Sequence, residues 1–328
     1  MSGDNSALDV VLVTQLPPDG WFEGFAIRPS NHILVPDLNS PVVYDLDPED
    51  PDSEPQIVYT FPDVVATLNL CPVPGRADTY TVLTADFCDL AASRWEGFAV
   101  WQLDLSAPAS PKAAKTGDLK DIVLPLGLCP VAERFALVAD STKACISVLD
   151  VTKGTSTTLL TDKASMEPQG ENGIFGINRL SIAGGYIWYS NFSGGTIHRA
   201  PYKMEPADGQ TPLRIVGPVE LVTDNLIHCD GFHVSSDGKT AYTANCLDGC
   251  LVETDLTKVG GGGASSKQVL DRLISPTCLE IGTDANGKRK VFVICCGEIE
   301  VGWMTGGPSW KDIANATVAT VEVTVSTE

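Results

Sequence analysis

Hydrophobic and polar residues alternate with a period of two along most of the chain, which is typical of β-strands with one buried face. The alternating runs are short, and turn dipeptides such as Asp237-Gly238 and Asn286-Gly287 separate them. Asp-Gly and Asn-Gly favour the tight turns that join antiparallel strands, and helical periodicity is nearly absent. The pattern therefore predicts an all-β chain of antiparallel hairpins.

A unit of two strands and a turn recurs along the chain. It begins FEGFAIRPSNHILV at residue 22 and CDGFHVSSDGKTAYTA at residue 229, and related segments begin at 68, 126, 177 and 276. Third and fourth alternating runs follow most of the copies, so that about four strands repeat roughly every 50 residues. We expect a six-bladed β-propeller with four antiparallel strands in each blade.

The repeat assigns the whole chain, residues 1–328, to a single domain. The blades are expected near 22–61, 68–124, 126–160, 177–223, 229–273 and 276–328 together with 8–16. Segments 8–16 and 317–325 each alternate but belong to no complete copy, so we expect them to complete the last blade together. Such pairing would close the ring without a free strand edge.

In a propeller the first strand of each blade lines the central channel, so equivalent residues at its start should form a ring at one mouth. The alignment places at this position Glu23, Asn69, Gly127, Asn178, Asp230 and Thr277. The side chains of Glu23, Asn178 and Asp230 offer the oxygen ligands that Ca²⁺ or Mg²⁺ prefers. Two alternatives are that one acid keeps a proton because the other raises its pKa, or that these side chains only hydrogen-bond neighbouring strands.

Composition narrows the possible partners. The chain has 42 acidic and 22 basic residues, a net charge of -20, and no stretch gathers the Lys and Arg that a phosphate backbone requires. We therefore expect no nucleic-acid partner. No apolar run approaches the roughly 20 residues that span a bilayer, and MSGDNSALDVV at the start lacks the features of a signal peptide. No GxSxG, P-loop or GxGxxG phrase indicates a nucleophilic serine or a bound nucleotide.

The ten cysteines and two sequons bear on the cellular compartment. Two-residue turns would set paired cysteines opposite each other in two hairpins, which predicts disulfides. The candidate pairs are Cys229–Cys246 and Cys278–Cys295, with Cys71–Cys88 as a third pair that lacks a matching turn. Asn191 and Asn315 begin glycosylation sequons. These features favour the secretory pathway or the extracellular space, whereas a chain that is complete as written would be cytoplasmic.

The repeats resemble the SMP-30/gluconolactonase-like six-bladed propellers, in which Glu, Asn and Asp side chains hold a divalent cation. The resemblance covers the repeats of the whole chain, and its motifs are the short phrases EGF at 23, INRL at 177 and CDGF at 229. It implies Glu23, Asn178 and Asp230 as ligands. Lactonases of this family carry a further polar residue where this chain has Gly127, so the fold is implied more strongly than lactone hydrolysis.

Longer phrases are similar to a fungal branch of the same superfamily. They include WFEGFAIRPSNHILV from 21, NGIFGINRLSI from 172 and YIWYSNFSGGTIHRAP from 186. This branch includes hetero-Diels-Alderases of tropolone sesquiterpenoid biosynthesis, which join an ortho-quinone methide to a humulene-type alkene. Such a reaction needs two apolar reactants held close together and a hydrogen-bond donor or cation at the carbonyl of the diene, without a nucleophile or a redox cofactor.

For this chemistry the resemblance implies a pocket at the ring. The catalytic candidates are Glu23, Asn178, Asp230 and, as a hydrogen-bond donor, His228. The candidates for substrate binding flank them and are Trp21, Phe22, Phe25, Asn69, Leu128, Phe175, Phe232, Thr277 and Trp303. Aromatic residues also pack between the blades of any propeller, and His228 could serve only as a structural hydrogen-bond partner.

Three functions remain as hypotheses. The first is a cofactor-independent pericyclase that acts on apolar small molecules, a hetero-Diels-Alderase. The second is a lactonase or esterase in which Ca²⁺ or Mg²⁺ at the ring activates water. The third is a binding propeller without catalytic activity, because the fold alone does not fix a function. A closed ring needs no partner chain for stability, so we expect a monomer.

Overall fold

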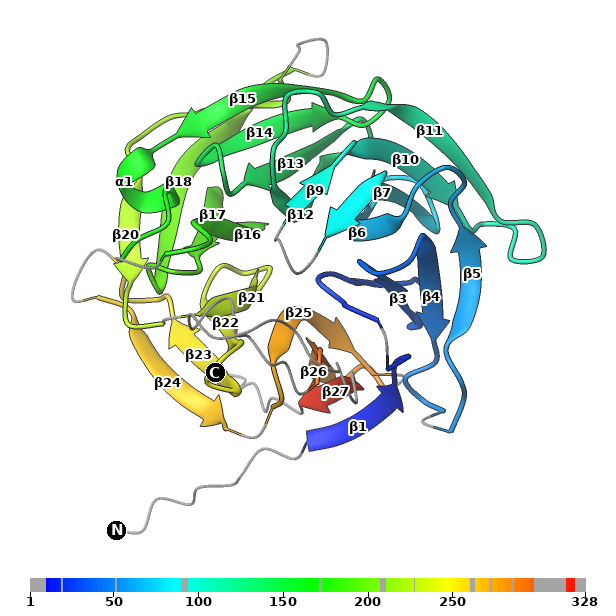
Figure 1. Ribbon diagram of the computed structural model, residues 1–328. Coiled ribbons are helices and arrows are strands. Elements are labelled where there is room, and N and C mark those ends of the chain that lie inside the picture. Colours follow the sequence, from blue (N-terminus) through cyan, green and yellow to red (C-terminus); the bar gives the residue numbers. More distant parts are fainter. Residues whose placement is uncertain are drawn as a thin grey trace, which may run out of the picture.

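The chain folds as a β-propeller whose sheets follow one another around a central axis (Figure 1). The computed structural model describes residues 10–18, 20–50, 52–89, 94–170, 173–206, 211–226, 228–259, 263–271, 273–284, 286–297 and 317–321. Within these residues strands dominate, and the short α1 (Lys163–Met166) is the one α-helix. No helix in this part of the chain is long and apolar enough to cross a membrane. The all-β propeller class predicted from the sequence is confirmed.

The described residues form six sheets of four or five strands, each antiparallel, and a two-stranded ribbon. The first sheet contains β2 (Ala26–Ile27), β3 (Ile33–Pro36), β4 (Val42–Leu46) and β5 (Gln56–Thr60). The second contains β6 (Ala66–Pro72), β7 (Thr79–Ala85), β10 (Ala99–Asp104) and β11 (Lys112–Asp118). The third contains β12 (Pro125–Ala132), β13 (Phe135–Asp140), β14 (Cys145–Asp150) and β15 (Thr155–Thr161).

The other three sheets complete the circle. The fourth contains β16 (Ile177–Ala183), β17 (Tyr186–Asn191), β18 (Thr196–Met204), β19 (Leu213–Ile215) and β20 (Glu220–Thr223). The fifth contains β21 (Cys229–Val234), β22 (Thr240–Asn245), β23 (Cys250–Asp255) and β24 (Ser265–Leu270). The sixth contains β25 (Pro276–Thr283), β26 (Arg289–Cys295), β27 (Thr317–Val321) and β1 (Val10–Gln15).

The sixth sheet joins the two ends of the chain. Strand β1 pairs with β27 in antiparallel register from Val10 opposite Val321 to Gln15 opposite Thr317, and β27 pairs in turn with β26. The predicted contribution of both chain ends to one sheet is therefore present. Because β27 lies between β1 and β26, both of its edges are hydrogen-bonded.

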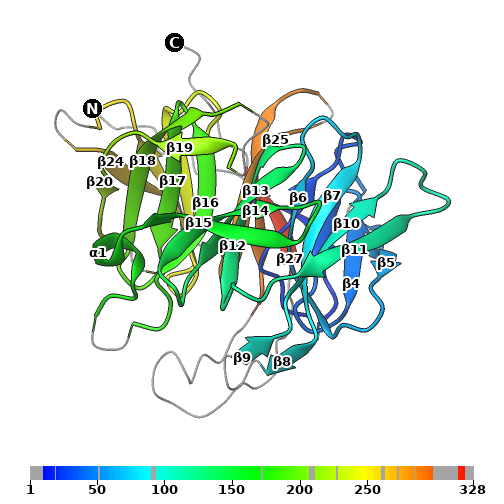
Figure 2. The ribbon, with the colours of Figure 1, turned by 90° about the horizontal axis from the view of Figure 1, so that it is seen from above.

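The ribbon of β8 (Phe87–Asp89) and β9 (Arg94–Glu96) lies in the connection from β7 to β10. It projects away from the large sheets at one end of the view in Figure 2. The ribbon accounts for the longest interval between copies of the repeat, which runs from 68 to 126. It is therefore an insertion into the four-strand unit.

Burial follows the position of a strand within its sheet. Every residue of β13 and β14, the middle strands of the third sheet, is buried, whereas β15 at the outer edge has only exposed and half-buried residues. The middle strands are covered on both faces because each sheet packs against its neighbours, and such strands are hydrophobic on both sides. The apolar core therefore lies between adjacent sheets.

A β-bulge near the start of the inner strand recurs in five sheets, on β6, β12, β16, β21 and β25. At each bulge one extra residue lies between two residues that are paired with the next strand. The extra residues are Leu68, Leu126, Asp230 and Thr277, and on β16 the two residues Asn178 and Arg179 oppose Ser190. The ring position predicted for Asn69 and Gly127 is therefore wrong by one residue, because Leu68 and Leu126 occupy it.

The cysteines of the predicted hairpin pairs do not lie opposite each other. Cys229 lies opposite Asn245, and Cys278 lies opposite Ile294, so that Cys246 and Cys295 are each one residue out of register. All ten cysteines are thiols. The predicted disulfides Cys229–Cys246 and Cys278–Cys295 are wrong. The bulge of β21 shifts Cys229, whereas in the hairpin of β25 and β26 the register between the turn and Cys278 already differs by one residue from that of a two-residue turn.

The third predicted disulfide, Cys71–Cys88, is also absent. Cys71 lies on β6 opposite Thr81, whereas Cys88 lies in the inserted ribbon opposite Trp95. The separation of the two cysteines in the sequence therefore does not correspond to one hairpin.

The predicted glycosylation of Asn191 does not fit the folded chain. Asn191 is fully buried, and its Nδ2 donates hydrogen bonds to the carbonyl oxygens of Ser165 (2.8 Å) and Glu167 (2.9 Å). A glycan on this nitrogen would displace both bonds and would have no path to solvent. The second sequon, at Asn315, lies outside the described residues.

Candidate active site

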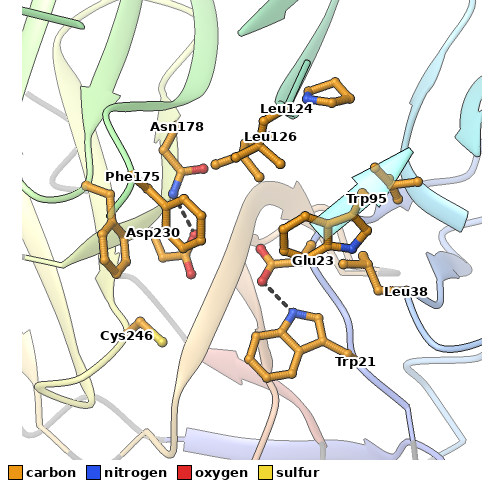
Figure 3. Close-up of a pocket in the computed structure, with 13 residues that line it drawn as sticks. Trp21, Glu23, Leu38, Trp95, Leu124, Leu126, Phe175, Asn178, Asp230 and Cys246 are labelled. Atoms are coloured by element: carbon orange, nitrogen blue, oxygen red, sulfur yellow. Dashed lines mark hydrogen bonds between the residues drawn. The ribbon is translucent and has the colours of Figure 1, made fainter. Parts of the chain in front are cut away.

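A cavity of about 690 Å³, which includes open space at its mouth, lies on the central channel (Figure 3). Its walls are mainly leucine, phenylalanine and tryptophan side chains. Three ionisable or amide side chains, Glu23, Asn178 and Asp230, interrupt this apolar lining. The cavity therefore joins the residues that the sequence predicted as a cluster, although they come from three different sheets.

The bulges bring these polar groups together. Asp230 is the extra residue of β21, and Asn178 lies in the bulge of β16, where it donates a hydrogen bond from Nδ2 to Asp230 Oδ1 (2.9 Å). Glu23 lies just before β2, and its Oε1 accepts a hydrogen bond from Trp21 Nε1 (2.6 Å). In a regular strand consecutive side chains point to opposite faces, but a bulge changes this direction locally.

Arg179 is the central residue of the cluster, although it was not among the site residues predicted from the sequence. Its side chain reaches from β16 to Glu23, where Nη2 donates to Oε2 (2.5 Å), and lies 3.5 Å from Asp230 Oδ1. The guanidinium also donates to the carbonyl oxygens of Leu126 (2.6 Å) and Thr277 (3.2 Å). Arg179 is only 4% exposed, and its guanidinium links β16 to residues in or just before the strands of four other sheets.

Strands β12 and β16 approach each other closely beside Arg179. A Cβ atom added to Gly127 would lie 2.4 Å from the carbonyl oxygen of Asn178 and 3.2 Å from Cα of Arg179. Only glycine fits this contact between two backbones. The glycine at position 127 is therefore set by packing between strands.

Glu23 and Asp230 lie beside one positive charge, the guanidinium of Arg179. Burial raises the pKa of Glu23, whereas Arg179 and the indole of Trp21 lower it by stabilising the carboxylate. Burial and the nearby charge of Glu23 raise the pKa of Asp230 well above its ordinary range, with Arg179 and Asn178 opposing them. Ionising both acids beside a single guanidinium would leave a net negative charge in a low-dielectric site.

We infer that Glu23 is the ionised member of the pair and that Asp230 keeps a proton. Glu23 receives a donor on each oxygen, at 2.6 Å and 2.5 Å, and one of these donors is charged. Asp230 receives the neutral amide of Asn178 on Oδ1 and only a long contact from Arg179. The site therefore holds an ion pair next to a neutral carboxylic acid in an apolar cavity.

A divalent cation does not fit among these side chains. The guanidinium of Arg179 already lies against both Glu23 and Asp230, and a dication there would have to displace it against charge repulsion. No group of three or more His, Cys, Asp or Glu side chains that could hold a metal occurs in the described part of the chain. The predicted ligands are brought together, but as partners of an arginine.

Four predicted substrate-binding residues lie further along the channel. Phe25, Asn69, Leu128 and Phe232 line a second cavity of about 1160 Å³, which Arg179 also contacts. A strand advances about 3.3 Å per residue, so a side chain two positions after the ring lies deeper along the same wall. These residues are separated from the first cavity by the cluster around Arg179.

Of the other predicted residues, Phe22, Thr277 and His228 do not line the first cavity. Phe22 is fully buried, and its carbonyl oxygen accepts a hydrogen bond from Oγ1 of Thr277 (2.5 Å), which ties the first sheet to the sixth. His228 lies behind Phe192, with ring centroids 5.5 Å apart, and is not a lining residue. Trp303 lies outside the described residues. Trp21 and Phe175 do line the first cavity, as predicted.

Several lining residues were not predicted. They are Leu38, Leu68, Trp95, Leu124, Leu126 and Phe192, with Pro125 and Cys246 completing the wall. Leu68 and Leu126 were missed because the bulges were not anticipated, and Arg179 was missed although it follows Asn178 in the phrase INRL. Trp95 lies in the insertion, which no repeat alignment can place.

Comparison with known proteins supports the fold. No protein-family model matches the chain, and no curated protein matches it. Similar solved structures include a glucose dehydrogenase-type oxidoreductase from Thermus thermophilus, with 12% identity, a TM-score of 0.58 and coverage of 96% of this chain and 99% of that chain. The PQQ-bound aldose sugar dehydrogenase from Streptomyces coelicolor has 11% identity and a TM-score of 0.50, with coverage of 96% and 98%.

A third similar structure is of a different kind. It belongs to a complex of nidogen and laminin and has 14% identity and a TM-score of 0.51, with coverage of 75% of this chain and 80% of that chain. At such identities the likeness shows a shared propeller fold. Because the same fold occurs in dehydrogenases and in this complex, function has to be argued from the cavity.

Proposed function

We propose that the protein is a pericyclase that joins an ortho-quinone methide to a humulene-type alkene by a hetero-Diels-Alder reaction. The observation that carries the proposal is a pair of buried acids, Glu23 and Asp230, beside the single guanidinium of Arg179 in an apolar cavity, from which we infer that Asp230 is neutral. The resemblance of the sequence to the fungal hetero-Diels-Alderases adds support. We also take each of the six larger sheets as one blade, as the repeat predicts.

The reaction needs little from the protein beyond orientation and polarisation. One C–C bond and one C–O bond form between the reactants, and the protein neither gains nor loses a proton. The acid of Asp230 donates a hydrogen bond to the carbonyl oxygen of the quinone methide and withdraws electron density from the diene. The apolar walls hold the alkene against the diene and exclude water, which would otherwise add to the quinone methide.

The lining of the cavity suits apolar reactants, because leucine, phenylalanine and tryptophan side chains surround its few polar groups. A metal-dependent hydrolase is less well supported, because Arg179 lies where the cation would have to bind. A binding propeller without catalysis would share the cavity but would not need a protonated acid.

The test compares two substitutions of Asp230. Asp230→Asn retains a neutral donor of the same shape, so we expect product formation within about tenfold of the wild type. Asp230→Leu has a similar size but no donor, and we expect a loss of about 100-fold, typical of removing one polarising hydrogen bond. The assay measures cycloadduct by chromatography from humulene and an ortho-quinone methide generated in situ, corrected for the reaction without protein.

The pH dependence tests the protonated state. In the wild type, activity should be present at low pH and should fall as pH rises through the raised pKa of Asp230. Asp230→Asn has no proton to lose, so its activity should not fall over the same range. If Asp230→Asn is as inactive as Asp230→Leu, or if lactone hydrolysis that EDTA abolishes appears instead, the proposal fails.

A further inference from the structure

The ribbon of β8 and β9 brings one aromatic side chain to the first cavity. Along β9, Arg94 and Glu96 point outward, with side chains 59% and 54% exposed, and they pair with each other at 2.6 Å. Trp95 between them points inward, because side chains alternate along a strand. It packs against the apolar core and lines the cavity.

Trp95 lies beside Trp21 in the cavity wall (Figure 3). Figure 3 shows Trp95 and Trp21 on the same side as the carboxylate of Glu23, whereas Asn178 and Asp230 lie on the other side. The edge of Trp21 is engaged, because its Nε1 donates to Glu23. The indole of Trp95 comes from a separate element and has no such bond to the acid pair. Leu124 and Leu126 form an aliphatic wall between the two sides.

We propose that Trp95 determines specificity by packing against the flat face of a conjugated carbonyl compound. Aromatic pairs gain about 0.5–1.5 kcal/mol beyond the burial of apolar area, which corresponds to roughly two- to tenfold in affinity. A saturated ring of the same size gains only the burial. The planar reactant thus lies against Trp95, and the aliphatic one lies against the wall of Leu124 and Leu126.

The inference rests on the proposed function for the identity of the reactants, but its test involves no turnover. Two neutral seven-membered ring ketones serve as probes: tropone, which is flat and conjugated, and cycloheptanone, its saturated counterpart. Isothermal titration calorimetry measures the affinity of both for the wild type, Trp95→Leu, Trp95→Phe and Arg94→Ala. Arg94→Ala is the matched control, because it changes the same ribbon on its outer face.

We expect the wild type to bind tropone more tightly than cycloheptanone. Trp95→Leu should weaken tropone binding about two- to tenfold and leave cycloheptanone within twofold, and Trp95→Phe should keep most of the preference. Arg94→Ala should change neither affinity. Equal losses of both probes in Trp95→Leu would show that Trp95 only shapes the wall, and no loss of either would place the ligand elsewhere; both results overturn the inference.

The same measurement separates this inference from the proposed reaction. In Asp230→Asn the preference for tropone should persist, because Trp95 is unchanged. If the preference is present but no cycloadduct forms in the turnover assay, the planar subsite stands and the pericyclase proposal fails. If cycloadduct forms but Trp95→Leu does not alter the preference, the pericyclase proposal stands and the planar subsite at Trp95 fails.

Discussion

At the scale of single residues, Arg179 decides the character of the site. It provides the only positive charge among the site residues named here, and it is almost completely buried between Glu23 and Asp230. The three residues predicted to bind a metal ion thus lie beside the guanidinium of Arg179, which is a cation supplied by the chain itself. The two acids therefore pair with this guanidinium.

Replacing Arg179 should therefore destabilise the fold, because its partner Glu23 would lose its counter-charge. In Arg179→Met the carboxylate of Glu23 stays buried without its counter-charge, and we expect a loss of about 3–5 kcal/mol in the free energy of unfolding. Adding Glu23→Gln should restore part of this loss, because it removes the stranded charge. Urea unfolding of the single and double variants measures the coupling.

The control for this prediction is Arg214→Met. Arg214 is 63% exposed and pairs with Glu205 on the surface (2.8 Å), so its replacement should cost at most about 1 kcal/mol. If the double variant loses the sum of the two single losses, charge pairing is not what Arg179 contributes.

At the scale of elements, the bulged inner strands fix the geometry of the cavity. The bulges place Leu68, Leu126, Asn178 and Asp230 in the cavity lining. Two of these strands approach each other closely at Gly127 of β12 and Asn178 of β16. The hydrogen bond from Arg179 to the carbonyl oxygen of Leu126 lies next to this contact. The position of Arg179 therefore depends on how closely β12 and β16 pack.

Gly127→Ala should disturb this contact. The added methyl group would meet backbone atoms that cannot rotate away, so we expect a loss of about 1–3 kcal/mol in unfolding free energy together with a lower product yield. Gly185→Ala is the control, since its φ of +81° carries backbone strain of about 1 kcal/mol while no atom lies within 4 Å of the new Cβ. A Gly127→Ala protein with wild-type stability would show that the strands separate without cost.

At the scale of the whole molecule, the ring depends on the pairing of β1 with β27. Val13 and Leu16, at and just after β1, are each 1% exposed, so this segment contributes to the core as well as to the sheet. Without β1, one edge of β27 would present unpaired backbone groups to solvent. Closure thus affects both stability and self-association.

A chain that begins at residue 17 should be less stable and more prone to associate. Loss of the burial of Val13 and Leu16 alone predicts a decrease of about 3–6 kcal/mol in the free energy of unfolding. Denaturant unfolding and size-exclusion chromatography measure the two effects, and a synthetic peptide of residues 1–16 added in excess should reverse both. Equal stability of the shortened and full chains would contradict a role of β1 in closure.

The alternating pattern and its repeat determined the fold class by themselves. Alternation depends on which faces of a strand are buried, and that information is local, so antiparallel hairpins and the propeller followed from it. The same repeat correctly grouped Glu23, Asn178 and Asp230 in one cavity, although they are distant in the sequence. Trp21 and Phe175 were correctly predicted as its walls for the same reason.

Only the tertiary structure decided what the cluster is. A bulge shifts the register by one residue without a clear signal in the sequence, and this shift put Leu68 and Leu126 on the ring and moved Cys229 out of register with Cys246. The direction of the Arg179 side chain depends on the close approach of β12 to β16, and the place of Trp95 depends on an insertion outside the repeat. Such features arise from packing between sheets, which local patterns do not encode.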